Sequence, residues 1–212
     1  MIEKLHWLGH ASFRLDGAKT VYFDPWKLPS LSKRADLILI SHEHFDHFSK
    51  DDVAAITAKD TVIVTTSQVA QDLKRARLPC REVVALSAGS SCDAGGIRIK
   101  AVPSYNINKD FHPKKSGKLG FLVSVDGGSI YHAGDTDYIP EMENLHCDIA
   151  LLPVSGTYVM TAEEAARAAL AIKPKVAIPM HYGDIVGSLS DAKRFADLLK
   201  GKVEVRVMEK EV

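Results

Sequence analysis

The sequence predicts an α/β fold in which two mixed β-sheets pack face to face and helices cover their outer faces. Two observations indicate this. Strand-length apolar segments open the chain as a meander, and strand-length segments then alternate with capped helices. The mixture recurs in two similar halves, which is typical of layered sheets and helices around a shared core. The length of 212 residues fits a single domain, 1–212.

The first half begins with three short strands, and Asp16-Gly17 supplies the turn between the second and the third. The continuous apolar run at 35–40 is typical of a strand buried on both faces. Ser67 can cap a helix, which ends before Pro79. The expected strands lie at 4–8, 12–15, 20–24, 35–40 and 61–65, and the expected helices at 51–58 and 68–76.

The second half carries clearer helix signals. Thr161 and Glu164 have the spacing of a capping box at the start of an Ala-rich helix, and Pro174 follows its end. Ser190 can cap a last helix, which Gly201 closes. The expected strands lie at 97–103, 119–125, 129–132, 148–152, 176–179 and 203–207, and the expected helices at 162–172 and 191–199.

The amino-acid composition limits the classes of partner that the chain is expected to bind. Lys and Arg together number 27, as do Asp and Glu, so the neutral chain is not expected to bind nucleic acid or an anionic membrane. The three cysteines form no C-x-x-C pair and are typical of reduced thiols. The first residues lack a basic segment followed by a long apolar run. We therefore expect a cytoplasmic enzyme that acts on a small molecule, and exposed sheet edges on which copies of the chain could pair.

A histidine-rich motif follows the buried strand at 35–40. Residues 42–47 read H-x-H-x-D-H. His42 and His44, two positions apart in an extended segment, point the same way and can bind one ion, whereas Asp46 and His47 follow a turn and can face a second ion. Imidazole and carboxylate ligands without cysteine favour a catalytic site for zinc, iron or manganese.

This short loop cannot fill two coordination spheres, so distant residues must complete them. Asp135 follows the strand expected at 129–132, and its carboxylate could bridge both ions. His181 follows the strand expected at 176–179 and is a second candidate ligand. Taken alone, Asp135 could belong to a plain turn and His181 could be a surface histidine. Together with the motif, the two residues predict a metal site.

These motifs, in this order, resemble those of the metallo-β-lactamase superfamily. The resemblance covers almost the whole chain. Within the superfamily, the sequence most resembles the small metal-dependent hydrolases near the ascorbate-6-phosphate lactonase branch. It implies a four-layered αβ/βα sandwich with the site at the sheet edges. The supporting stretches are Phe23-Asp24-Pro25, Tyr105-Asn106-Ile107-Asn108-Lys109, Phe111-His112-Pro113-Lys114, Gly134-Asp135-Thr136 and Leu152-Pro153-Val154.

The resemblance also exposes a departure. The superfamily takes a further histidine for the His42 and His44 ion from a strand end in mid-chain, where this sequence has none. His10 and His112 could each replace it. Of the two we expect His10, because a turn at a strand end holds a ligand better than a long loop does. His112 is then expected to contact substrate or transfer a proton. Asp24 is expected to orient a ligand imidazole.

The implied reaction is hydrolysis. Two divalent ions, most simply Zn²⁺, with Mn²⁺, Ni²⁺ or Fe²⁺ as alternatives, would activate a shared water as the nucleophile. Asp46 is expected to bind one ion and to orient this nucleophile, and either His112 or a metal-bound water to protonate the leaving group. Lactones and phosphodiesters are the expected substrates. Lysines dominate the charges of the loop 105–118, which favours an anionic substrate, although a solvated, mobile loop is about as typical of such charges; they are Lys109, Lys114, Lys115 and Lys118.

Two other activities are known among proteins that this chain resembles. Di-iron redox relatives need an acidic metal ligand where His44 stands here, and they carry a flavin domain that has no counterpart in this sequence. Nucleic-acid-processing relatives carry a long insert between the later motifs, whereas 46 positions separate Asp135 from His181. We therefore expect hydrolysis of a small molecule, with redox chemistry and nucleic-acid processing as the two alternatives.

Overall fold

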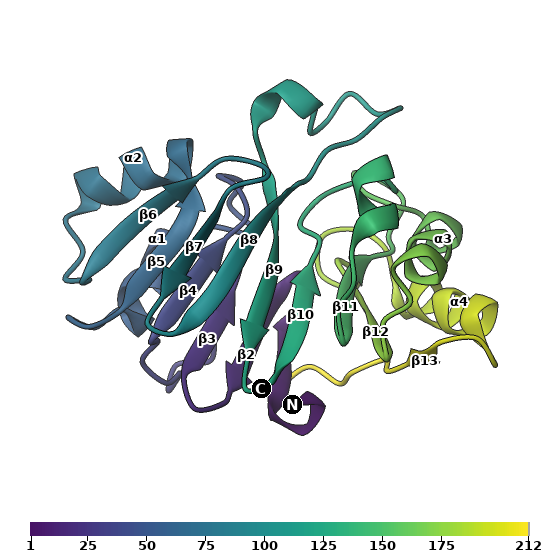
Figure 1. Ribbon diagram of the computed structural model, residues 1–212, viewed down its shortest axis with the longest axis horizontal. Coiled ribbons are helices and arrows are strands. Elements are labelled where there is room, and N and C mark those ends of the chain that lie inside the picture. Colours follow the sequence, from purple (N-terminus) through teal and green to yellow (C-terminus); the bar gives the residue numbers. More distant parts are fainter. Residues whose placement is uncertain (212) are drawn as a thin grey trace.

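Two β-sheets form the centre of the molecule, with helices on their outer sides (Figure 1). The computed structural model describes residues 1–211. One sheet runs in the order β1 (Leu5–Gly9), β2 (Ser12–Asp16), β3 (Thr20–Phe23), β4 (Leu37–Ile40), β5 (Val62–Thr66) and β6 (Glu82–Leu86). The other runs in the order β13 (Glu204–Val205), β12 (Val176–Met180), β11 (Ile149–Pro153), β10 (Gly128–His132), β9 (Leu119–Val125), β8 (Ile97–Pro103) and β7 (Ser91–Ala94).

Each sheet is mixed, as predicted. Strands β1 to β3 are antiparallel and β3 to β6 parallel, while β10 to β13 are parallel and β7 to β10 antiparallel. It follows that β1 and β4 end at one edge of the first sheet, and that β8, β10 and β12 end at one edge of the second. The loops that carry the predicted site residues all leave from these edges.

Strand β4 shows how an apolar sequence corresponds to a position in the middle of the sheet. All four of its residues are buried. Leu37 and Leu39 face the core between the sheets, whereas Ile38 and Ile40 pack under the helices that cover the first sheet. Because successive side chains of a strand point to opposite faces, only a strand covered on both faces reads as a continuous apolar run.

The helices begin close to the predicted positions. Helix α1 (Lys50–Ile56) and helix α2 (Ser67–Ala76) belong to the first half, and α3 (Ala162–Ile172) and α4 (Leu189–Leu199) to the second. The capping box of Thr161 and Glu164 is confirmed. Two predicted caps were wrong: Thr66 caps α2 and Ser188 caps α4, where Asp191 completes a second capping box.

The sequence prediction missed β6 and β7 and overextended the last strand. Strand β6 lies at a sheet edge with only Leu86 buried, and β7 lies at an edge with only Ala94 buried, so neither has the apolar pattern of a buried strand. Beyond β13 the chain instead crosses to the first sheet, where Lys210 pairs with Trp7 in a parallel bridge. Within residues 1–211, no helix is long and apolar enough to cross a membrane.

Candidate metal centre

A tight turn divides the histidine motif into two parts. The backbone amides of His47 and Phe48 both donate to the carbonyl oxygen of His44, at 3.0 and 2.8 Å. Ser49 then caps α1 by accepting a hydrogen bond from the amide of Asp52. The turn separates His42 and His44, which follow β4, from Asp46 and His47, which precede α1, so the motif contributes to two groups of candidate ligands, as its spacing predicted.

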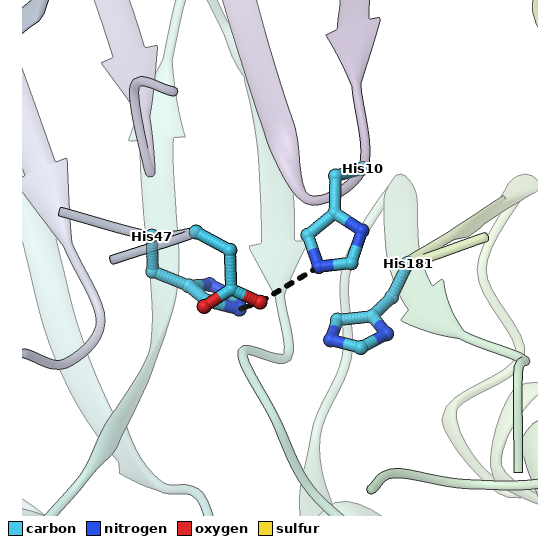
Figure 2. A group of neighbouring side chains, drawn as sticks. His10, His47 and His181 are labelled. Atoms are coloured by element: carbon cyan, nitrogen blue, oxygen red, sulfur yellow. Dashed lines mark hydrogen bonds and ion pairs between the residues drawn. The ribbon is translucent and has the colours of Figure 1, made fainter. Parts of the chain in front are cut away.

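The first group, here called the His10 group, consists of His10, Asp46, His47 and His181. One potential ligand atom from each lies within 4.8 Å of all the others. Figure 2 shows the three imidazoles turned toward one another, and the ring centroids of His10 and His181 are 3.9 Å apart. His10 Nε2 lies 3.0 Å from a carboxylate oxygen of Asp46. This geometry suits one ion with three nitrogen ligands and one oxygen ligand.

The second group, here called the His42 group, consists of His42, His44, His112 and Asp135, whose ligand atoms also lie within 4.8 Å of one another. His112 Nε2 is 3.2 Å from His44 Nδ1. Lys118 Nζ approaches the other nitrogen of His44 at 3.3 Å, which leaves Nδ1 directed into the group. The two groups together contain every residue that the sequence predicted as a metal ligand, and also His112.

Asp135 lies between the two groups. Its Oδ1 is 3.1 Å from His47 Nε2 and 3.3 Å from His181 Nε2. Its Oδ2 is 3.5 Å from His112 Nε2 and 3.9 Å from His42 Nε2. One carboxylate therefore faces nitrogens of both groups, which is the position that the predicted bridging role requires.

The structure corrects the partner expected for His10. His10 belongs with Asp46, His47 and His181, and His112 takes the place beside His42 and His44. The expectation assumed that a long loop positions a ligand poorly. Here the loop is pinned, because His112 Nδ1 lies 3.2 Å from the Tyr158 carbonyl oxygen and Asn106 bonds both flanking segments.

The buried nitrogens are unpartnered in a way that suits metal ions. Among residues 1–211, His10 Nδ1, His42 Nε2, His47 Nε2, His181 Nε2 and Asp135 Oδ1 are buried without a hydrogen-bond partner. Buried polar atoms are rarely left unsatisfied without a reason such as an ion. Three of these atoms, the Nε2 nitrogens of His42, His47 and His181, lie within 3.9 Å of an oxygen of Asp135. The residues present therefore fit two metal ions.

Four of the imidazoles are held neutral. Burial lowers the pKa of His10, of His44 and, most strongly, of His42 below the usual value. Burial also lowers the pKa of His112 to about 4. Near pH 7 each of these rings is uncharged and carries a lone pair, which is the form that binds a metal.

His47 and the carboxylates behave differently. Burial opposes the charge of His47, but Asp135 and Asp24 outweigh it and raise the pKa of His47 well above the usual value. Burial likewise opposes the charge of Asp135, yet His181 and His47 hold its pKa well below the usual value. Burial also opposes the charge of Asp46, but the hydrogen bond from His10 outweighs it and lowers the pKa of Asp46 to about 2. Without metal, a protonated His47 therefore faces ionised carboxylates.

This charge state predicts a pH dependence of metal binding. An ion in the His10 group must displace the proton of His47, so its affinity should rise about tenfold per pH unit below the raised pKa. The His42 group, already neutral, should change much less between pH 6.5 and 8. Competition with a chromophoric chelator in the His112→Ala and His10→Ala variants separates the two groups. Equal pH slopes in both variants would contradict the assignment.

A layer of hydrogen bonds orients the ligand rings. Asp24 accepts hydrogen bonds from the amide and hydroxyl of Ser41 at 2.7 and 2.6 Å, and its Oδ2 lies 2.7 Å from His47 Nδ1. Ser41 Oγ also lies 2.8 Å from His42 Nδ1. The role predicted for Asp24 agrees with this contact. Ser155 Oγ, which the sequence analysis missed, lies 3.1 Å from His181 Nδ1.

Backbone strain gathers at the site. His10, Asp24, His112 and His181 all have positive φ angles, between 42° and 61°. Such angles are uncommon outside glycine and persist only where the surroundings enforce them. At His10 and His181 the enforcement is mutual, because the His10 carbonyl oxygen accepts the His181 amide hydrogen at 2.9 Å. This bond ties together two ligand turns that come from different sheets.

Gly134 controls the approach of Asp135 and supports a stability prediction. Its φ is 65°, and a Cβ there would lie 2.8 Å from the Leu119 carbonyl oxygen. Gly134→Ala should therefore lower the free energy of unfolding by about 1–2 kcal/mol for the backbone angle, and by a further 1–3 kcal/mol or so for overpacking. Gly95→Ala is the control, because φ is 63° but nothing lies within 4 Å. Equal urea midpoints for the two variants would refute the clash.

A cavity of about 480 Å³ opens over the two groups. Its floor includes His44, Asp46, His112 and Asp135. Its walls are formed by Glu43, Phe45, Phe111, Tyr158 and Ile185. A small molecule entering this cavity would therefore reach atoms of both groups.

Comparisons with known proteins agree with this architecture. Residues 4–181 match a family model described as a beta-lactamase superfamily domain. A protein from Thermococcus onnurineus named UPF0173 metal-dependent hydrolase is 32% identical, over 97% of this chain and 96% of its own.

Two solved structures are similar throughout. A protein from Parabacteroides distasonis, provisionally identified as a metal-dependent hydrolase, is 32% identical with a TM-score of 0.86, over 98% of this chain and 93% of that one. Igni18, a metallo hydrolase from the archaeon Ignicoccus hospitalis, is 26% identical with a TM-score of 0.80, over 98% and 95%.

Proposed function

This chain belongs to the beta-lactamase superfamily, among the metal-dependent hydrolases of the UPF0173 family, and on that premise we propose that it hydrolyses a small-molecule ester bond with two metal ions. The bond is that of a lactone or a phosphodiester. The observation that carries the proposal is the position of Asp135, whose two oxygens face nitrogens of two separate imidazole groups.

The donor atoms define the ions that suit the site. The His10 group offers three imidazoles and the Asp46 carboxylate, and the His42 group offers three imidazoles and the shared Asp135. Nitrogen and oxygen ligands without thiolates favour Zn²⁺, with Mn²⁺, Ni²⁺ and Fe²⁺ as alternatives. When bound, two such ions supply an acidified water as nucleophile and polarise the oxygen of the scissile bond.

The protein groups position the reactants. Asp46, ionised because its pKa is about 2, can accept a hydrogen bond from a water molecule between the groups and so orient it. We assign His112 to ligation instead of the proton transfer expected from the sequence. Its pKa of about 4 keeps the ring neutral near pH 7, and its Nε2 faces His44 and Asp135.

The test is a substrate panel on metal-free protein reloaded with each ion. Bis(p-nitrophenyl) phosphate and γ-phenyl-γ-butyrolactone represent the two bond types. We expect zinc or manganese to restore turnover of at least one substrate, and chelation to abolish it. Failure to hydrolyse either substrate with any ion, together with oxygen consumption by the iron-loaded protein, would support the redox alternative.

A further inference from the structure

Apolar side chains surround the mouth of the cavity above the metal centre. Phe45, Phe111 and Ile185 line it although they are 67%, 52% and 41% exposed, and the half-buried Tyr158 lies between them and the floor. They come from the histidine motif, the loop before β9, the loop after β12 and the segment before α3. Clustered exposed apolar side chains at a cavity generally indicate a binding surface.

Contacts hold part of this wall in place. Phe111 packs edge-to-face against Tyr158 with ring centroids 4.7 Å apart. Phe45 lies in a T-shaped arrangement with Trp26, whose centroid is 6.1 Å away. The carbonyl oxygens of Phe111 and Tyr158 both accept hydrogen bonds from Asn106. A wall of braced aromatic rings loses little conformational entropy when an apolar group binds to it.

The wall of the cavity offers no cationic side chain to a charged substituent. Asp46 and Asp135 belong to the two metal groups, and within residues 1–211 the only other charged residue lining the cavity is Glu43, with no lysine or arginine. The Lys118 side chain is 4% exposed and pairs with Glu43 at 2.9 Å.

The other paired lysines of this loop are also engaged by acidic side chains of the protein. Lys109 pairs with Asp137 and lies 3.8 Å from Glu164, and Lys114 pairs with Glu141 at 2.8 Å. The lysine excess that led us to expect an anionic substrate is therefore largely neutralised by the protein.

We propose that this mouth binds an uncharged aryl or branched alkyl substituent of the substrate, so that the protein hydrolyses hydrophobic esters or lactones in preference to phosphorylated or carboxylated ones. The inference rests on the proposed function for the reaction and on the cavity wall for the selectivity. The substituent lies against Phe111 and Ile185, and the scissile bond lies over Asp135.

The first test compares three lactones on the metal-loaded protein. γ-Phenyl-γ-butyrolactone should show a kcat/KM at least about tenfold above that of γ-butyrolactone. The 4-carboxyphenyl analogue, of nearly the same shape, should lose that gain. A preference for the carboxylated compound would overturn the proposal in favour of an anionic substrate.

Variants locate the selectivity. Phe111→Ser and Ile185→Ser should each lower the ratio of kcat/KM for the phenyl lactone to kcat/KM for γ-butyrolactone by about fivefold to tenfold, mainly through the KM of the phenyl lactone. Leu31→Ser is the matched control, because Leu31 is apolar and 95% exposed but does not line the cavity. Equal losses for both lactones, or a loss in the control, would overturn the proposal.

A binding measurement separates this proposal from the reaction itself. Calorimetry of the phenyl lactone with metal-free protein should detect binding that Phe111→Ser weakens and Leu31→Ser leaves unchanged. Binding of this kind without hydrolysis by any metal-loaded form would sink the proposed function but keep the apolar site. Hydrolysis that ignores the phenyl group would keep the function and sink the apolar site.

Discussion

Replacing Asp135 with Ala is expected to lower kcat by on the order of 10³, well beyond the 10–100-fold effect of losing an outer hydrogen-bond partner. The reason is its position, since Oδ1 faces His47 and His181 while Oδ2 faces His42 and His112. Both groups lose an oxygen at once, and their buried imidazoles are left facing one another. Metal content by mass spectrometry and turnover should therefore fall together.

Asp148→Ala is the control for this experiment. Asp148 accepts hydrogen bonds from Ser129 near the start of β10, whereas Asp135 follows the end of the same strand. We expect this variant to retain its metal ions and its activity even where it loses some stability. An Asp135→Ala protein that keeps both ions and its full rate would refute the bridging position.

Asp24→Asn is expected to weaken the metal affinity of the His10 group by about 10–100-fold. The substitution keeps the shape of the side chain, and asparagine tolerates the φ of 42° at this position. It removes a carboxylate oxygen that lies 2.7 Å from His47 Nδ1 and accepts the hydroxyl hydrogen of Ser41. His47 then loses the partner that holds its ring and its tautomer.

The same variant should destabilise the metal-free protein, by about 1–3 kcal/mol. Because the folded-state pKa of His47 is raised, its charge stabilises the fold fully below the usual pKa of 6.5 and ceases to do so as the pH passes the raised value. The deficit of Asp24→Asn in urea should therefore be largest at or below pH 6 and shrink at alkaline pH. A loss of stability that is the same at every pH would show that the charge of His47 is not its cause.

Much of the fold can be predicted because the burial of a strand, on one face or on both, leaves a recognisable pattern of apolar residues in the sequence. The continuous apolar run of β4 and the alternating pattern of β8 each indicate a strand directly, and β8 has the predicted bounds. The edge strands β6 and β7 were missed because their side chains are largely exposed. Their pairing depends on the neighbouring strand more than on their own sequence.

The candidate site shows the same division. The histidine motif predicted that Asp135 and His181, each after an expected strand, would join it in one metal site, because a short loop cannot fill two coordination spheres alone. Which histidine joins which group could not be predicted, since it depends on contacts between distant loops. His112 is held by the Tyr158 carbonyl oxygen, 46 positions along the chain, and His10 by the turn that carries His181.

His10 and His112 lie in two different candidate metal groups. This arrangement is tested by the number of ions bound per chain at saturating zinc in the wild type, His10→Ala, His112→Ala and the double variant. We expect two ions in the wild type, one held tightly in each single variant, and none held tightly in the double variant. One tightly bound ion in the double variant would mean that both histidines serve the same position, and would overturn the assignment of two metal groups.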